Sequence, residues 1–547
     1  MQNYRRFIFI WGLVFWSALS FASPFPLEIN EPDSLKTPKN WFNLDPEKDG
    51  VMGTSANRAH EKLLEGKNPQ RTVIVAVIDS GVDIEHEDLQ GKIWVNQDEI
   101  QGNGKDDDGN GYIDDVNGWN FIGGADGANI EEDSYELTRE YVRLKPIYED
   151  ADPDRIKRRH QEEYDYWLRI KKELEEKKEE AELNYKFTSG LQENLIAVAE
   201  VLKEALGKED MKEEDLAGLE SGNEEVEKAA AMVGQMFMRI GQEGTSLNEI
   251  LEDLAGVVEH YENQVKFAYN PHFDPREIVG DDPIDYKDKT YGNPDVIGPD
   301  ASHGTHVAGI IAADRTNDLG IQGIAEHVLI MPVRAVPNGD ERDKDIANAI
   351  YYAVDNGAHI INMSFGKSYS PGKNKVDKAV KYAKRKGVLL VHAAGNSGKE
   401  VHADNNFPNR WLTKRRKAPN WIEVGANAWQ GDKNLPGSFS NYSDQGVDLF
   451  APGVDMYSTL PGNEYKSNSG TSMAAPVVSG VTALIMAYYP DLKPSEVKAI
   501  LKQSVYNQAE QLVIKPGNEE EVAFGSLSIT GGVVNAYQAL QLAESIK

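Results

Sequence analysis

The stretch RTVIVAVIDSGVD, residues 71–83, decides the fold class of this chain. Its apolar run ends at Asp79, and Gly81 lets the chain turn, which is typical of a buried strand that stops at an acidic residue. Helical periods over Asp343–Asn356 and Lys375–Arg385 alternate with further apolar runs. These runs are VLIMPVRAV (328–336), HIINMSF (359–365), GVLLVHAA (387–394) and WIEVGA (421–426). We therefore predict an α/β fold with a doubly wound, mainly parallel sheet and reactive groups at the carboxyl ends of the strands.

The composition excludes several kinds of partner. The 547 residues carry a net charge of -31, from 89 acidic and 58 basic side chains, so the chain would repel a nucleic-acid backbone or an anionic membrane. The sequence contains no cysteine, which rules out a disulfide framework and a thiolate metal site. We expect a well-hydrated protein that is stabilised by packing and by bound cations.

The N-terminus, MQNYRRFIFIWGLVFWSALSFASP, has the pattern of a secretory signal peptide. Two arginines precede the apolar run Phe7–Leu19, and small residues follow it up to Ala22. We predict a signal peptide over residues 1–22 and an N-terminal arm over residues 23–70. The protein is then extracytoplasmic, either periplasmic or secreted, with no membrane contact beyond export. The alternative is an uncleaved membrane anchor.

An acidic, helical region interrupts the strand rhythm between residues 131 and 270, inside a peptidase-like domain that we place at 71–547. Its apolar residues recur every three or four positions, which predicts amphipathic helices that pack on one another as a helical subdomain. Ser246 and Glu249 form a capping box for the last of them. The alternative is a solvated, partly disordered segment. The four apolar stripes are Tyr164/Trp167/Ile170/Leu174, Leu191/Leu195/Val198/Leu202, Val226/Ala229/Val233/Phe237/Ile240 and Leu247/Ile250/Leu254/Val257/Tyr261/Val265.

Four polar residues beside glycines and small residues supply the groups for nucleophilic catalysis. Asp79 ends a strand, His303 opens a helix in SHGTHVAGIIAAD, and Ser472 stands at the head of the apolar helix in SNSGTSMAAPVVSGVTALI. A serine hydroxyl needs a base to take its proton, and the base needs a carboxylate to orient its ring. Asn396, in VLLVHAAGNSG, can donate to the oxyanion together with the backbone N–H of Ser472.

Seven stretches together make the chain resemble the subtilisin-like serine peptidases. They are AVIDSGVD (76–83), SHGTHVAGI (302–310), INMSFG (361–366), AAGNSG (393–398), FSNYS (439–443), FAPG (450–453) and SGTSMAAPVVSG (469–480). The resemblance implies an endopeptidase that hydrolyses proteins or peptides through an acyl-enzyme, without an organic cofactor. In it Asp79 orients the base, His303 is the general base and then the acid, Ser472 is the nucleophile and Asn396 the oxyanion donor.

The resemblance also implies a substrate-binding site. In the HGTH run the first histidine is the catalytic one, so His306 is expected to be a packing residue. The edge that pairs with the substrate backbone would consist of Ser364, Phe365 and Gly366, and one wall of the primary specificity pocket of Ala393, Ala394 and Gly395.

A second constellation, GNGKDDDGNGYIDDVNGWNF, has the spacing of an oxygen-rich calcium loop. Asn117 stands where an EF-hand has its bidentate glutamate, and no flanking helices are evident. The alternative is a turn cluster of Asp, Asn and Gly without an ion. The predicted ligands are Asp106, Asp108, Asn110, Tyr112 through its carbonyl, and Asp114.

Two features depart from the compact members of that family, and a basic cluster is a further feature of the chain. The helical insertion separates Asp79 from His303, and a long surface insertion costs little because loop-closure entropy grows slowly with length. The N-terminal arm is too short for a folded inhibitory prodomain, so the insertion is a candidate for covering the cleft, assisting folding or docking a partner. The basic cluster TKRRK, residues 413–417, either favours acidic substrates or is a solvated loop. Two alternatives to a general endopeptidase remain: a scaffold protein without turnover and a processing protease with few substrates.

Overall fold

The computed structural model describes residues 37–217, 219, 221–240, 245–412 and 416–546. The predicted signal peptide, the first part of the N-terminal arm and Thr413–Arg415 of the basic cluster lie outside the described residues. The chain divides into two compact units: residues 37–178 with 266–547, and a smaller unit that includes residues 179–265.

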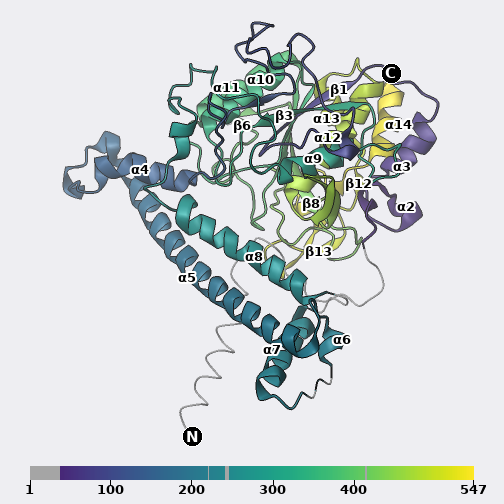
Figure 1. Ribbon diagram of the computed structural model, residues 1–547. Coiled ribbons are helices and arrows are strands. Elements are labelled where there is room, and N and C mark those ends of the chain that lie inside the picture. The colour runs from purple at the N-terminus through teal and green to yellow at the C-terminus, as the bar shows by residue number, and fades with distance from the viewer. Residues whose placement is uncertain (1–36, 218, 220, 241–244, 413–415, 547) are drawn as a thin grey trace. The chain divides into compact units, whose positions relative to one another are not determined.

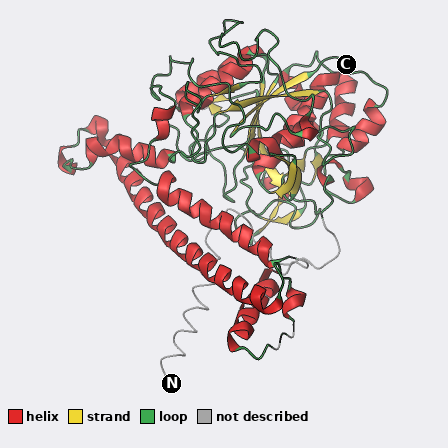
Figure 2. Cartoon of the chain, in the orientation of Figure 1, coloured by secondary structure: helices red, strands yellow, loops and turns green. Residues whose placement is uncertain are grey.

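A mainly parallel sheet forms the centre of the larger unit, as predicted (Figures 1 and 2). Within the described residues it has nine strands in the order β12-β15-β9-β8-β5-β4-β1-β3-β2, and only β12 runs antiparallel to its neighbour. The strands are β1 (Val73–Asp79), β2 (Trp119–Asn120), β3 (Val328–Arg334), β4 (Ile360–Met363), β5 (Leu389–Ala393), β8 (Trp421–Asn427), β9 (Leu449–Pro452), β12 (Tyr506–Asn507) and β15 (Gly532–Val533). Separate hairpins are β6 (Trp411–Leu412) with β7 (Arg416–Lys417), β10 (Met456–Leu460) with β11 (Glu464–Asn468), and β13 (Leu512–Ile514) with β14 (Glu521–Ala523).

Both faces of the sheet are covered by helices, which explains why its strands are mostly apolar. Val75 and Val77 of β1 belong to one buried cluster, whereas Ala76 and Ile78 belong to another on the opposite face. The first cluster includes residues of α9 (Ser302–Ala312), α12 (Thr471–Tyr488), α13 (Pro494–Gln503) and α14 (Ala536–Ile546). The second includes residues of α10 (Asp343–Asp355) and α11 (Lys373–Lys386). The helix α12 is long and apolar enough to cross a membrane, but it is buried in this core.

The described part of the N-terminal arm packs onto the same unit. Its short helices are α2 (Pro46–Asp49) and α3 (Ala56–Ala59). Trp41 and Phe42 are fully buried in the cluster that also contains α12 and α14. The arm therefore contributes to the core of the larger unit.

The inserted region is helical, as predicted, but its helices differ from the four expected ones. They are α4 (Glu136–Tyr148), α5 (Gln161–Leu206), α6 (Glu213–Leu216), α7 (Glu224–Ile240) and α8 (Leu247–Asn263). The first two stripes, which we expected on separate helices, lie on the single helix α5, because the residues between them are mostly good helix formers such as Glu, Lys and Ala. Ser246 caps α8 as predicted: its Oγ accepts from the N–H of Glu249 at 3.2 Å.

The two units bury different parts of α5. In the smaller unit, Leu195 and Leu202 of α5 join one apolar cluster with Val233 and Phe237 of α7 and Leu247 of α8. In the larger unit, the start of α5 packs on α4, where the ring of Trp167 stacks on that of Tyr141 with centroids 5.2 Å apart.

Candidate functional site

Three neighbouring strands bring the predicted site residues to one edge of the sheet. The strands β5, β4 and β1 lie side by side and are parallel, so their carboxyl ends meet. Asp79 is the last residue of β1, Ser364 directly follows β4, and Asn396 follows β5 after a short turn. The sequence rule on strand ends therefore places three of the candidates together.

Asp79 and His303 form a hydrogen-bonded pair. His303 Nδ1 lies 2.7 Å from Oδ1 of the buried Asp79 carboxylate, which accepts the hydrogen bond. His303 stands in the first turn of α9, and this helix approaches β1 so closely that a Cβ on Gly304 would lie 2.0 Å from the carbonyl oxygen of Gly81. The glycine after the histidine is therefore needed for the approach that brings the pair together.

The environment of His303 shifts its pKa upward. Burial by itself lowers the pKa, but the adjacent negative charge and hydrogen bond of Asp79, with a smaller contribution from Asp300, outweigh it. The imidazolium form is thus stabilised, which suits a group that takes a proton during the reaction.

Ser472 lies in the first turn of α12 and contacts the residue after β4. Its Oγ donates to the carbonyl oxygen of Ser364 at 3.1 Å, and the hydroxyl of Ser364 donates to the carbonyl oxygen of Ser472 at 2.8 Å. Among the described residues, no hydrogen bond joins Ser472 to His303. Such bonds are often loose without substrate and tighten when it binds.

The side chain of Asn396 is oriented by Thr471. Its Oδ1 accepts from both the backbone N–H of Thr471, at 2.9 Å, and the hydroxyl of Thr471, at 2.8 Å. The two donors of the amide nitrogen therefore point elsewhere, and this Nδ2 lies 3.3 Å from where a Cβ on Gly470 would stand. Sequence reasoning missed Thr471, although its place directly before Ser472 could have suggested it.

A cleft of about 520 Å³ is lined by three of these residues, Asn396, Thr471 and Ser472. Of the predicted substrate-binding residues, Phe365, Gly366, Ala393 and Gly395 line it, together with Asn396 and Ser472. Two others do not line it. Ser364 is only 4% exposed and lies beneath the edge, and Ala394 is fully buried in an apolar cluster. Several further lining residues were not predicted, among them Lys367 and Tyr369 directly after the predicted edge. Arg169 was also missed, because nothing in the sequence links α5 to this edge.

The second histidine of the HGTH run has the environment of a packing residue. His306 is fully buried, and its Nε2 lies 3.1 Å from the carbonyl oxygen of Lys466. Burial lowers its pKa to about 4, so the ring is neutral at ordinary pH.

A buried network of charges, which we call the root network, lies beside the cleft at the base of the insertion. Its members are Glu136 and Arg139 of α4, Glu341 and Asp343 at the start of α10, and Lys367. Lys367 Nζ lies 2.8 Å from a carboxylate oxygen of Glu136 and 3.1 Å from one of Asp343, and it donates to the carbonyl oxygen of Glu341 at 2.6 Å. Although burial acts to raise the pKa of Glu136, Arg139 and Lys367 hold that pKa at about 2.

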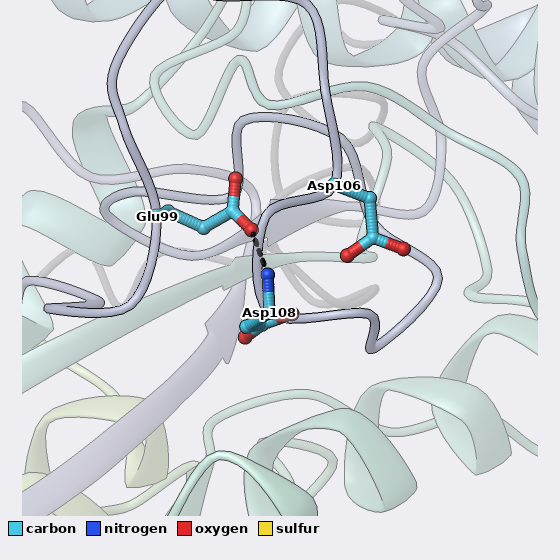
Figure 3. Close-up of side chains that lie close together, drawn as sticks. All are labelled: Glu99, Asp106 and Asp108. Carbon is cyan, nitrogen blue, oxygen red and sulfur yellow. Dashed lines mark hydrogen bonds between the residues drawn. The ribbon is translucent and has the colours of Figure 1, made fainter.

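The predicted calcium loop gathers three carboxylates, one of which the sequence analysis missed. Glu99, Asp106 and Asp108 have carboxylate oxygens within 4.8 Å of one another (Figure 3). One oxygen of Glu99 accepts from the N–H of Asp107 and of Asp108, at 2.7 and 3.1 Å. The other, Oε2, is buried and has no hydrogen-bond partner among the described residues. An unpartnered carboxylate oxygen beside two others fits a hard cation.

Two other predicted ligands accept backbone hydrogen bonds within the loop, as Asp106 and Asp108 also do. The carboxylate of Asp114 accepts from the N–H groups of Asn103 and Gly104, at 3.1 and 2.9 Å. The side-chain oxygen of Asn110 accepts from the N–H of Tyr112 at 2.8 Å. The alternating side chains of the loop from Asp106 to Asp114 therefore hold the turn together through hydrogen bonds. Glu99 completes the carboxylate cluster with Asp106 and Asp108.

Comparison with known proteins identifies the family of the chain. A family model described as the subtilase family matches residues 70–525. The thermophilic serine proteinase of Bacillus sp. strain AK1 is 42% identical over 217 residues, which are 40% of this chain and 48% of that protein. Subtilisin DY of Bacillus licheniformis is 37% identical over 207 residues, 38% of this chain and 70% of that protein. The chain thus spans about half the length of the first of these relatives.

Proposed function

Because the chain belongs to the subtilase family, we propose that it is a serine endopeptidase that hydrolyses peptide bonds through an acyl-enzyme on Ser472. The observation that carries the proposal is the hydrogen bond of 2.7 Å between His303 and Asp79, at the same sheet edge as Asn396 and Ser472. The names of the relatives, which are proteinases and subtilisins, support the same reaction.

In the proposed mechanism, each of these residues has one task. His303 takes the proton of the Ser472 hydroxyl through its Nε2 while Oγ attacks the substrate carbonyl. Asp79 holds the ring through Nδ1 and stabilises the imidazolium that forms. The developing oxyanion accepts from Nδ2 of Asn396, which Thr471 orients, and from the backbone N–H of Ser472. His303 then protonates the leaving amine, and water hydrolyses the acyl-enzyme by the reverse sequence.

A serine-directed phosphonylating reagent tests this proposal. We expect one covalent adduct per protein molecule, on Ser472, with loss of peptide hydrolysis at the same rate. The Ser472→Ala variant should neither be labelled nor hydrolyse peptides, and Ser469→Ala, on the turn before α12, is the matched control. A wild-type protein that folds but is not labelled would instead support a scaffold protein without turnover.

We further propose a calcium ion at the carboxylates of Glu99, Asp106 and Asp108. The support is the buried, unpartnered Oε2 of Glu99 and the oxygen-only donor set, which suits Ca²⁺. Such an ion would offset most of the negative charge of the three clustered carboxylates and fix the loop that precedes β2. Its role is therefore in stability, because this chain's catalytic groups need no metal.

Export and partner docking also remain proposals. The pattern of residues 1–22 supports secretion to an extracytoplasmic compartment, which N-terminal sequencing of the mature protein would test: a chain that begins at Ala22 or earlier would contradict it. The helical insertion is a candidate surface for a protein partner or for restricting access to few substrates. The insertion can be deleted and the cleavage-site profile measured on a denatured proteome. An unchanged profile would contradict the role in restricting access to few substrates.

A further inference from the structure

Arg169 of the inserted helix α5 is the only lining residue of the cleft, among those described, that comes from the helical insertion. All other lining residues follow β4 or β5, lie near residue 441, or begin α12. Arg169 belongs to the same compact unit as Ser472, so its place at the cleft is defined within one body.

The segment after β4 holds this part of α5 in position. Tyr369 Oη donates to a carboxylate oxygen of Glu173 at 2.5 Å. The ring of Tyr369 also packs edge-on against that of Tyr166, with centroids 6.1 Å apart. Tyr166, Arg169 and Glu173 are spaced by three and four residues, so they share one face of the helix. The apolar face of the same turns, with Trp167 and Ile170, is buried.

Within the described residues, Arg169 contacts two tyrosines, Tyr166 and Tyr369, rather than a carboxylate. In the described part of the chain, no carboxylate oxygen forms an ion pair with it, and the nearby Glu173 is engaged by Tyr369. The Arg169 guanidinium lies 5.2 Å from the ring centroid of Tyr166 and is exposed. Burial and the hydrogen bond to Glu173 raise the pKa of the Tyr369 hydroxyl. Arg169 is close enough to this hydroxyl to oppose that rise.

The other basic residues that line the cleft, Lys367 and Lys399, come from the segments after β4 and β5. Lys367 is buried and paired with Glu136 and Asp343 in the root network. The exposed Lys399 lies on the loop after β5, in the same loop as the exposed acids Glu400 and Asp404. Among the described residues, Arg169 is therefore the one charged side chain that α5 contributes to the cleft lining, in a chain with a net charge of -31.

We propose that Arg169 binds an acidic side chain of the substrate and so gives the enzyme a preference for peptides with Glu or Asp on the acyl side of the scissile bond. This inference rests on the proposed peptidase function and names its substrate class. A guanidinium on a rigid helix presents a planar set of donors that matches a carboxylate, and partial enclosure by the cleft strengthens such a bond. The insertion then acts as a specificity element, because it supplies one wall of the substrate-binding cleft.

Paired peptides that differ only by Glu or Gln at one position test the proposal. When the varied residue occupies one particular position before the scissile bond, we expect wild-type enzyme to cleave the Glu peptide with a kcat/KM about tenfold higher than that of the Gln peptide. In Arg169→Gln this ratio should fall to about one. Arg169→Glu should instead prefer a third peptide, with Lys at the same position, over the Gln peptide. The ratio also should shrink in high salt, because the ion pair is partly exposed.

Lys172→Gln is the matched control. It removes the same charge from the same helix, but Lys172 is exposed, pairs with Glu176 and does not line the cleft. It should keep the wild-type ratio. An equal loss in both variants would show a general charge effect, and a ratio of one in wild-type enzyme at every position would overturn the proposal.

A binding measurement separates this inference from the proposed function. The dissociation constants of the Glu and Gln peptides are compared on the Ser472→Ala protein, with and without Arg169→Gln. If wild-type protein is neither labelled nor active, the proposed function fails, and the ratio of these constants still decides the role of Arg169. If the enzyme is active and the ratio is one, only the inference about Arg169 fails.

Discussion

His303 shows how two opposing influences on one side chain are resolved in this site. Burial favours its neutral form, whereas Asp79 at 2.7 Å and the nearby Asp300 favour the charged form and prevail. A general base must be neutral to accept a proton and is stabilised in the charged state by its carboxylate partner. The raised pKa of His303 therefore sets the lower pH limit of activity.

The first prediction concerns this limit. The protonated base is inactive below its pKa, so kcat/KM should rise with pH along an acidic limb that lies above the ordinary histidine value of about 6.5. Asp300→Asn removes one of the charges that raise the pKa but keeps an acceptor for the N–H of Ser302. We expect the limb to move to lower pH in Asp300→Asn with the same plateau.

Asp79→Asn should instead lower kcat by about four orders of magnitude, because the ring loses both its orientation and its counter-charge. The measurement is a pH profile of peptide hydrolysis for the three proteins. An acidic limb at the same pH in wild-type and Asp300→Asn enzyme would show that a group other than His303 titrates.

At the scale of elements, the root network ties the insertion to the substrate edge. Lys367 directly follows Gly366, which lines the cleft, and its backbone pairs with that of Phe407 in both directions, at 2.8 and 2.9 Å. The side chain of Lys367 forms an ion pair with Glu136 of α4. The base of the insertion and the segment that would bind substrate therefore share one buried set of charges.

The second prediction is that Lys367→Met destabilises the larger unit by about 3–5 kcal/mol, because Glu136 and Asp343 lose a buried counter-charge. The free energy of unfolding is measured in urea. Adding Glu136→Gln should recover part of the loss, since it removes one of the stranded charges. Lys145→Met, on the exposed face of α4, is the control and should change stability by less than about 0.5 kcal/mol. Similar losses for Lys367→Met and Lys145→Met would contradict the role of the network.

The sequence predicted the elements better than the contacts between them. The strands were predictable because a strand covered on both faces reads as a nearly continuous apolar run, and β1, β3, β4, β5 and β8 all have this pattern. Asp79 and Asn396 were predictable as residues at strand ends. Glu99 and Arg169 were not, because each reaches its site from a segment with no chemical pattern of its own. The length of α5 was missed because its charged middle gives no apolar period to follow.

At the scale of the whole molecule, the insertion and the carboxylate cluster both lie between Asp79 and His303 in the chain. The catalytic pair is nevertheless in contact, because both segments leave the sheet after β1 and return before α9. Stability of the larger unit then depends on how the intervening loops are fixed, and a cation at Glu99 would fix one of them.

The third prediction is therefore that calcium raises the melting temperature of the protein and that chelation lowers it. At a concentration about 100 times the dissociation constant, the ion should add about 2.7 kcal/mol and about 3 °C. Glu99→Gln should abolish most of this shift, whereas Asp98→Asn, at the exposed neighbouring position, should retain it. Equal melting temperatures of wild-type protein with calcium and with a chelator would refute the site.

The pairing of Val73 in β1 with Val328 in β3 has a consequence for synthesis on the ribosome. At about 5–20 residues per second, β1 leaves the exit tunnel on the order of ten seconds or more before the strands on either side of it exist. During that interval a fully apolar segment with two unpaired edges is open to aggregation. The intervening helices α7 and α8 make local contacts and can fold in the meantime. For this chain the order of translation therefore makes the nascent β1, ahead of any other strand of the central sheet, the natural target of a chaperone.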